Sequence, residues 1–380
     1  MSRRCSQSHP LVLFLLFFQW RSPLAADNAT ADNATAHTQF GPVDGAVVRA
    51  RNGRRVRQWL SIPYAQPPLG ALRFAPPAPF LGPFPSGRFR ATHAGVYCVQ
   101  TPYPGQQGPQ PPGVEDCLVL SIWAPASPGA AAGVGAAPVL FWVHGGDFIQ
   151  GNGDQYNGTE LAAKHNVVVV AINYRLGDLG WLQPVAGLAN FGLLDQRAAL
   201  RWAHANIADF GGDPGRILLF GESAGAISVA THLLSPASDR LFATALMESG
   251  FPSAKDQPYA LRIADAYSEA AGCSGEGRGG GSGSGSGINA KLRVACLRAA
   301  PLALLQAAAA AATALPPGAP PFGEVGWGPT VDGRAAGLPE TPARMLASGR
   351  VNGGRAHVLA GANQDEGTAF VFPQYPQGLN

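Results

Sequence analysis

The sequence is poor in charge, and no part of it concentrates charge of one sign. Charged residues make up 13% of the 380 positions, the formal net charge is +3, and lysine and arginine form no long run. A protein that follows a phosphate backbone needs such a run, so we do not expect nucleic acid as a partner. The hydrophobic share of 46% instead favours a large buried core.

No apolar run is long enough to cross a bilayer, so no transmembrane segment is expected. The run at residues 11–18 follows Arg3 and Arg4 and precedes the small residues Ala25 and Ala26, which is the layout of a secretory signal. A core helix is the alternative, but the extreme N-terminal position and basic flank argue against it. We therefore assign residues 1–25 to a signal peptide and expect a secreted, extracellular protein.

Cysteines are few, and none has the Cys-x-x-Cys spacing that a structural zinc site usually needs. Cys5 would leave with the signal, so Cys98, Cys117, Cys273 and Cys296 remain. Four cysteines allow three pairings, and the two local ones, Cys98 with Cys117 and Cys273 with Cys296, each close a short loop. Disulfides are favoured over zinc, and no metal or cofactor is expected.

Polar and low-complexity stretches separate the patterned parts of the chain. Residues 26–38 are polar and repetitive and are expected to form a mobile tail, while the Gly- and Ser-rich residues 274–287 should form a flexible loop. N-glycosylation sequons stand at Asn28, Asn33 and Asn157. The remainder, residues 39–380, is expected to form the folded domain.

Short apolar runs alternate with helical patterns along this domain. Strands are expected at residues 139–143, 167–172, 217–220 and 358–360, and a helix at residues 193–210 before Gly211 and Gly212. Alternation of this kind predicts an α/β fold with a largely parallel twisted sheet and helices on both faces.

The strongest chemical signal is Gly-Glu-Ser-Ala-Gly at residues 221–225, between an expected strand and an apolar helical stretch. A Gly-x-Ser-x-Gly turn in that context is so tight that only small residues fit its flanks, and it raises the serine hydroxyl above the sheet edge. An ordinary glycine-rich turn is the bland alternative. The context favours Ser223 as a nucleophile.

A serine nucleophile also needs donors for the oxyanion that forms on its substrate. His144, Gly145, Gly146, Asp147 and Phe148 follow an expected strand, where a loop can offer backbone N–H groups opposite the residue after the nucleophile.

Together these segments resemble the type-B carboxylesterase and cholinesterase family. Further matching segments are residues 61–70, 115–118, 173–175, 190–196 and 210–214, so the resemblance covers most of the chain. It implies an α/β-hydrolase fold, an oxyanion hole of Gly146, Asp147 and Ala224, and Glu366 as the acid of a catalytic triad. It also implies the two local disulfides and ion pairs that join Arg73 to Glu115 and Arg175 to Asp195.

The implied activity is hydrolysis of small-molecule carboxylic esters through a serine acyl-enzyme, with a non-catalytic adhesion or binding protein as the alternative. Three departures bear on it. Asp147 stands where the family has Gly or another small residue, so its side chain must turn away or the rate suffers. The loop between Cys98 and Cys117 has no Trp to hold a quaternary ammonium, so a choline ester is a poor guess.

The third departure concerns the general base. In this fold the order is nucleophile, acid and histidine, yet no histidine follows Glu366. His144, His232 and His357 are more simply explained as structural residues. We therefore expect the sequence to lack the catalytic histidine and to be incomplete at its C-terminus.

Overall fold

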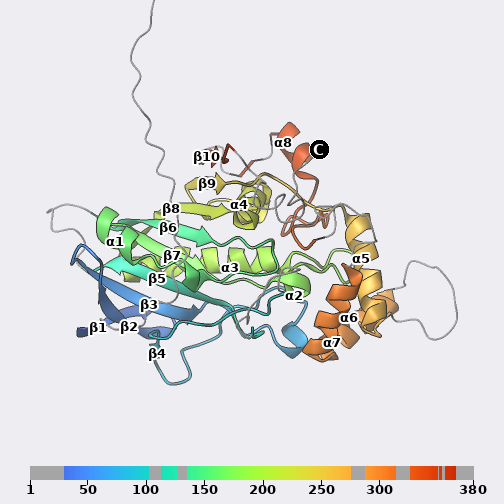
Figure 1. Ribbon diagram of the computed structural model, residues 1–380, viewed down its shortest axis with the longest axis horizontal. Helices are drawn as coiled ribbons and strands as arrows, with labels where there is room; N and C mark the ends of the chain where they lie inside the picture. Colours follow the sequence, from blue (N-terminus) through green and yellow to red (C-terminus); the bar gives the residue numbers. More distant parts are fainter. Residues whose placement is uncertain are drawn as a thin grey trace, which may run out of the picture.

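A ten-stranded mixed sheet forms the centre of the fold in the computed structural model (Figure 1). The structure describes residues 30–101, 113–126, 135–274, 287–313, 326–349, 351–352 and 356–364. The strand order is β1-β2-β3-β5-β7-β6-β8-β9-β10, with β4 beside β2. The strands are β1 Thr30–Thr38, β2 Gly41–Arg49, β3 Arg55–Pro63, β4 Phe89–Arg90, β5 Val119–Pro125, β6 Ala137–Val143, β7 Val168–Ile172, β8 Gly212–Glu222, β9 Thr244–Glu248 and β10 His357–Gly361.

The sheet divides into an antiparallel half and a parallel half. Strands β1, β2, β3, β5 and β7 pair antiparallel in that order, whereas β7, β6, β8, β9 and β10 pair parallel. The expectation of a largely parallel sheet therefore holds only for the second half. For β1, β2 and β3 the reason is that they follow one another through short turns, which cannot make the crossover that parallel neighbours require.

The expectation of a mobile tail does not hold for residues 30–38, which form β1 and pair with β2. Ala34 and Ala36 are buried on the sheet face, while Thr35 and His37, which alternate with them, are exposed. This is the two-residue alternation of a strand. This alternation is weak in the sequence, because alanine is less hydrophobic than the branched residues that usually mark a strand.

Helices cover both faces of the sheet. They are α1 Thr159–His165, α2 Gly177–Trp181, α3 Phe191–Asn206, α4 Ala224–Leu234, α5 Gln257–Ala270, α6 Gly287–Ala299, α7 Leu302–Ala312 and α8 Pro342–Ala347, with short 3-10 turns at Gly70–Leu72, Gly153–Gln155, Ile207–Phe210 and Pro236–Ser238. Helix α1 packs through Ala162 and Ala163 against one face, and α3 and α4 pack against the other. The expected helix at residues 193–210 is present as α3 and the 3-10 turn after it.

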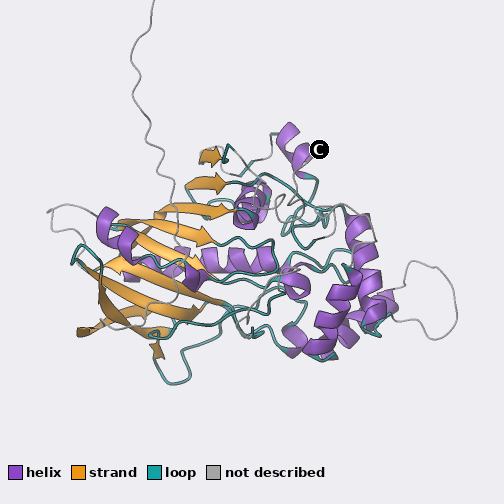
Figure 2. Cartoon of the chain, viewed as in Figure 1, coloured by secondary structure: helices purple, strands orange, loops and turns teal. Residues whose placement is uncertain are grey.

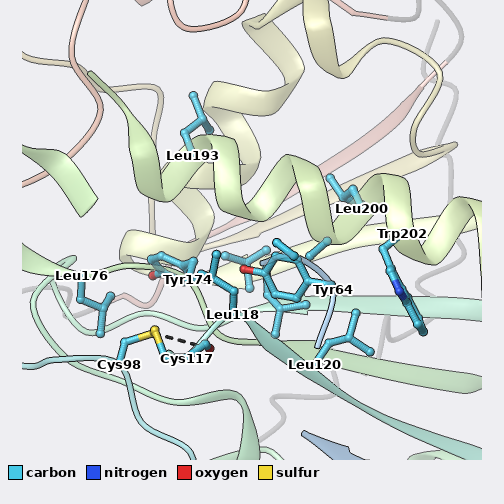
Figure 3. Packing of buried hydrophobic residues seen from close by; sticks show 14 of the residues in the cluster. Tyr64, Cys98, Cys117, Leu118, Leu120, Tyr174, Leu176, Leu193, Leu200 and Trp202 are labelled. Carbon is cyan, nitrogen blue, oxygen red and sulfur yellow. Dashed lines mark hydrogen bonds between the residues drawn. A yellow bond between two sulfur atoms is a disulfide. The ribbon is translucent and has the colours of Figure 1, made fainter. Parts of the chain in front are cut away.

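Helix α3 forms a large part of the main core. Its Leu200 and Trp202 lie on the same side of the sheet as Tyr64 and Leu120 (Figure 3). These side chains are completely or almost completely buried between α3 and the strands. Burial of each large apolar side chain favours folding by roughly 1.5–3 kcal/mol.

Helices α5, α6 and α7 gather beyond one end of the sheet (Figure 2). Cys273, after α5, is disulfide-bonded to Cys296 in α6, and Cys98 is bonded to Cys117, so both expected disulfides are present. The Gly- and Ser-rich residues 275–286 lie outside the described residues, as does the expected signal at residues 1–25.

Both expected ion pairs are also present. The Arg73 guanidinium donates to Glu115 at 2.6 and 2.7 Å, and Arg175 donates to Asp195 through two 2.7 Å bonds. Both pairs are bidentate; the pair of Arg73 is partly buried and that of Arg175 is buried, the setting in which removal of one partner is most costly.

Within the described ranges, no single helix is long and apolar enough to cross a membrane, although the bent pair Asn289–Ala299 and Leu302–Ala312 passes that test together, by length and composition only.

Candidate active site

Ser223 occupies the turn between β8 and α4 with an unusual backbone conformation. Its φ is 54° and its ψ is −121°, a region that residues with side chains rarely adopt and that costs about 1–3 kcal/mol. The backbone is held on both sides, because Ser223 N–H donates to the Glu248 carbonyl and its own carbonyl accepts from Ile227, both at 2.9 Å. The side chain is partly exposed at the carboxyl edge of the sheet.

The packing around Ser223 leaves no room for a side chain at the two flanking glycines, Gly221 and Gly225. A Cβ on Gly221 would lie 2.6 Å from the Val143 carbonyl oxygen, and one on Gly225 would lie 2.1 Å from the same oxygen. The turn after β8 therefore sits directly on the end of the neighbouring strand β6. Any larger residue at these two positions would push the start of α4 away from the sheet.

The loop that follows β6, residues 144–148, passes over this turn, and we call it the glycine loop. A Cβ on Gly145 would lie 2.7 Å from the Glu222 carbonyl oxygen and 3.2 Å from the Ser223 Cβ. Gly146 has a φ of 105° and leaves no room for a Cβ, which would lie 2.2 Å from the Gln150 oxygen. Close packing of this kind brings the loop within reach of a substrate bound at Ser223.

The proposed oxyanion donors are backbone N–H groups of the glycine loop and of the first turn of α4. Among the described residues, the backbone N–H groups of Gly146, Asp147 and Ala224 donate to no protein acceptor. Ala224 is the first residue of α4, where backbone N–H groups have no partner inside the helix and carry the positive end of its dipole.

Asp147 and Phe148 both have positive φ values, 54° and 60°. Asp147 is exposed to solvent, while Phe148 is buried and packs edge-on against Trp181 with ring centroids 4.6 Å apart. Partial loss of hydration beside the neighbouring protein raises the pKa of the Asp147 carboxyl, and the nearby positive charge of Lys255 acts in the opposite direction. The charge of Lys255, which sequence reasoning did not bring to the site, therefore partly balances Asp147.

His144 has a structural environment at the base of this loop. Its ring is fully buried, stacks on Tyr174 with centroids 4.4 Å apart, and has Nδ1 2.7 Å from the Gly145 carbonyl oxygen. Tyr174 also donates to the His144 carbonyl at 2.8 Å. Burial lowers the pKa of His144 to about 4, so the imidazole is neutral at pH 7.

The two remaining histidine candidates lie in unsuitable places. His232 is buried in α4 with both ring nitrogens occupied, by Ser238 at 2.9 Å and Gln196 at 3.1 Å. His357 begins β10, which runs parallel to β9, so it lies at the opposite end of that strand from the edge that carries Ser223. No histidine in the described part of the chain hydrogen-bonds to Ser223.

Strand β9 supplies contacts that the sequence did not reveal. Besides the Glu248 carbonyl that holds Ser223, Ser249 N–H donates to the Gly361 carbonyl at 2.8 Å, and Asn363 donates to Ser249 Oγ at 3.4 Å. The chain beyond β10 thus returns to the edge that carries Ser223. Glu366 lies outside the described residues.

The glycosylation candidates are only partly placed. Asn157 is exposed before α1, with its side-chain oxygen accepting from Thr159 N–H at 2.9 Å. Asn33 lies in β1, and Asn28 is outside the described ranges. No cluster of three or more potential metal ligands occurs among the residues that the structure describes.

Comparison with known proteins gives one family across the chain. The model of the "Carboxylesterase family" matches residues 32–378. Mouse (Mus musculus) cholinesterase is 36% identical over 390 residues, which covers 97% of this chain and 58% of the relative. Rabbit (Oryctolagus cuniculus) cocaine esterase is 44% identical over 226 residues, which covers 56% of this chain and 41% of the relative.

Among solved structures, a PNB esterase matches with a TM-score of 0.73 and 33% identity, over 90% of this chain and 66% of that one. The α/β-hydrolase fold expected from the sequence is therefore confirmed. The chain spans between 41% and 58% of the length of the two curated relatives named above.

Proposed function

The chain belongs to the carboxylesterase family, and on this premise we propose that it hydrolyses carboxylic esters through an acyl-enzyme formed on Ser223. The observation that carries the proposal is the conformation of Ser223 at the start of α4, beside three backbone N–H groups with no described acceptor. Preorganised donors of this kind typically contribute about 3–4 kcal/mol each to lowering the barrier of acyl transfer.

In the proposed reaction, Ser223 Oγ attacks the ester carbonyl carbon while its proton passes to a base. The carbonyl oxygen becomes an oxyanion held by the N–H groups of Gly146, Asp147 and Ala224. Its collapse expels the alcohol, which takes up the proton, and water then releases the acid from the serine by the same steps.

Glu366 is the proposed acid of the triad. Its support is the course of the chain, because Gly361 and Asn363 already contact Ser249, the residue after the Glu248 carbonyl that holds Ser223. An acid three residues further on could orient a histidine at this edge, as in other serine hydrolases.

The substrate class is a small uncharged ester. The relatives include a cholinesterase and a cocaine esterase, but the loop between Cys98 and Cys117 of this chain has no Trp with which to hold a choline headgroup. We also propose that the protein is secreted and carries glycans at Asn28, Asn33 and Asn157. The two disulfides and the signal-like N-terminus support this location.

Labelling with a fluorophosphonate tests the nucleophile. With millimolar imidazole supplied as a base, the wild-type protein should form one adduct, located at Ser223 by peptide mass spectrometry, and Ser223→Ala should form none. Ser253→Ala is the matched control, because Ser253 lies nearby in the loop after β9 and should leave labelling unchanged. An adduct elsewhere, or undiminished labelling of Ser223→Ala, would exclude the proposed role and favour a non-catalytic protein.

A second experiment tests the base. Because no described histidine contacts Ser223, we expect the 380-residue chain alone to hydrolyse a short-chain nitrophenyl ester only slowly. Millimolar imidazole in solution should raise the Ser223-dependent rate, and should have no such effect on Ser223→Ala. Fast turnover that imidazole does not change would show that a histidine of this chain already serves as the base.

A further inference from the structure

A groove of about 410 Å³ runs along the outward face of α3, and neither Ser223 nor the glycine loop lines it. Leu194, Ala198, Arg201 and Ala205 form its floor, at helical spacings of four, three and four residues that place them on one side of the helix. Residues 76–80 form one wall and residues 332–337 the other. We call this feature the α3 groove.

Much of the α3 groove is apolar. Phe40 and Phe80 both line it and pack edge-to-face with ring centroids 5.3 Å apart. Tyr64 and Trp202, which lie between α3 and the sheet, close its inner end (Figure 3). Such a surface favours an alkyl or aromatic group, since each buried methylene contributes about 0.8 kcal/mol.

Among the described residues that line the groove, three are arginines, Arg197, Arg201 and Arg334, and one is a carboxylate, Asp332. That carboxylate is already engaged, because it accepts from Asn190 at 3.1 Å and from the Leu338 N–H at 3.0 Å. Hence the three cations outnumber the one anion, and the groove is complementary to a negatively charged group.

Arg197 is the unusual member of this set, because its side chain is buried and yet forms no ion pair with a described carboxylate. Its guanidinium donates to Ser235 at 2.7 Å, to Ser238 at 2.9 Å and to the Ala336 carbonyl. A guanidinium has five N–H donors, so two have no acceptor among the residues described here. A buried cation of this kind is costly unless an anion or water completes its bonds.

Arg201 stands at the rim of the groove and is nearly free to turn. It is exposed, and its one hydrogen bond among the described residues is a 3.3 Å bond to the Ala237 carbonyl. It could therefore swing toward a bound anion with little loss of existing contacts.

From these observations we infer that the α3 groove binds a medium-chain alkyl carboxylate, with the chain against Phe40, Phe80 and Trp202 and the carboxylate between Arg197 and Arg201. The volume lies within the range of small-molecule sites, about 300–1,000 Å³. The arginine fork matches a carboxylate in bidentate geometry. This site is separate from Ser223 and does not depend on the proposed ester hydrolysis.

Isothermal titration of the full chain with decanoate, kept below the concentration at which it aggregates, tests the inference. Decanoate should bind saturably with one site. Decanol, which lacks the charge, and decyltrimethylammonium, which reverses it, should each bind at least about tenfold more weakly, as expected if roughly 1.4 kcal/mol comes from the charge. Equal binding of all three, or no saturable binding of decanoate, would overturn the inference.

Variants locate the site. Arg201→Gln should weaken decanoate binding about tenfold, and Ala205→Trp, at an exposed position in the groove, should block it. Arg262→Gln is the matched control, since Arg262 is an exposed helix arginine in α5 that does not line the groove. If Arg201→Gln and Ala205→Trp bind like the wild type, the α3 groove is not the site. If prior modification of Ser223 by a fluorophosphonate abolishes binding, the ligand occupies the serine site instead.

Discussion

Replacement of Gly225 by alanine is the sharpest test of how the nucleophile turn is held. The new Cβ would lie 2.1 Å from the Val143 carbonyl oxygen, whereas real Cβ contacts essentially never fall below 3.0 Å. Val143 ends β6, which pairs with β7 on one side and β8 on the other, so its carbonyl cannot retreat without breaking the sheet. The start of α4 must therefore move by about 0.9 Å.

This movement carries Ser223 and the Ala224 N–H with it. A misplacement of about 1 Å can cost roughly 10²-fold in rate, and overpacking of this kind costs about 1–3 kcal/mol of stability. We expect Gly225→Ala to label with a fluorophosphonate about 100-fold more slowly than the wild type. Its melting temperature should also fall by a few degrees.

Gly361→Ala is the matched control, because Gly361 lies near the same edge and no atom of the described residues lies within 4 Å of its Cβ position. Its labelling rate and melting temperature should stay close to those of the wild type. If Gly225→Ala fails to fold, Gly145→Ala takes its place, since its Cβ would meet the Glu222 carbonyl at the milder distance of 2.7 Å. Labelling of either variant at the wild-type rate would refute the reasoning.

Three further predictions follow from the structure. Asp147→Asn removes a negative charge next to the proposed oxyanion and should raise the labelling rate by roughly two- to tenfold, and an unchanged rate would mean that the carboxylate does not act on the site. Burial raises the pKa of Asp178 to about 6. Because the folded state then holds its proton more tightly than the unfolded state, stability should fall between about pH 4 and pH 6, by roughly 3 kcal/mol at most, and level off above. Asp178→Asn keeps an acceptor for the Tyr267 hydroxyl and should lack that contribution, so thermal unfolding of the two proteins should diverge across this range and not elsewhere. Loss of the disulfide between Cys98 and Cys117 in the double alanine variant should lower the free energy of unfolding by about 3 kcal/mol in denaturant titrations, and an unchanged midpoint would contradict this.

The nucleophile turn could be predicted from the sequence because its requirements are local. The residues on either side of Ser223 must be small, a strand must precede them and a helix must follow, and all of these signals lie within about twenty residues. The ion pair of Arg175 with Asp195 could be predicted for another reason, because the family resemblance supplied the partner. The structure confirms the strand, turn and helix around Ser223 and the ion pair, while the role of Ser223 as nucleophile stays a prediction.

Other features depend on contacts that no local pattern contains. Strand β1 is stabilised by pairing with β2 and by the burial of two alanines, and its polar, repetitive composition is typical of a tail. The Glu248 carbonyl that fixes Ser223 comes from β9, which was not among the strands expected from the sequence. Both features become visible only when the sheet order is known.

Asp147 shows most clearly what could not be predicted from the sequence. The sequence left two outcomes, a carboxylate that turns away from the oxyanion or a slower reaction, because it could not say which charges surround the side chain. In the structure Asp147 is exposed, and Lys255 supplies a nearby positive charge. Lys255 is positioned by backbone hydrogen bonds to Pro329 and Val331, both 2.9 Å long. The electrostatic balance at the glycine loop therefore depends on two distant segments, and a change in either one should alter how strongly Asp147 opposes an oxyanion.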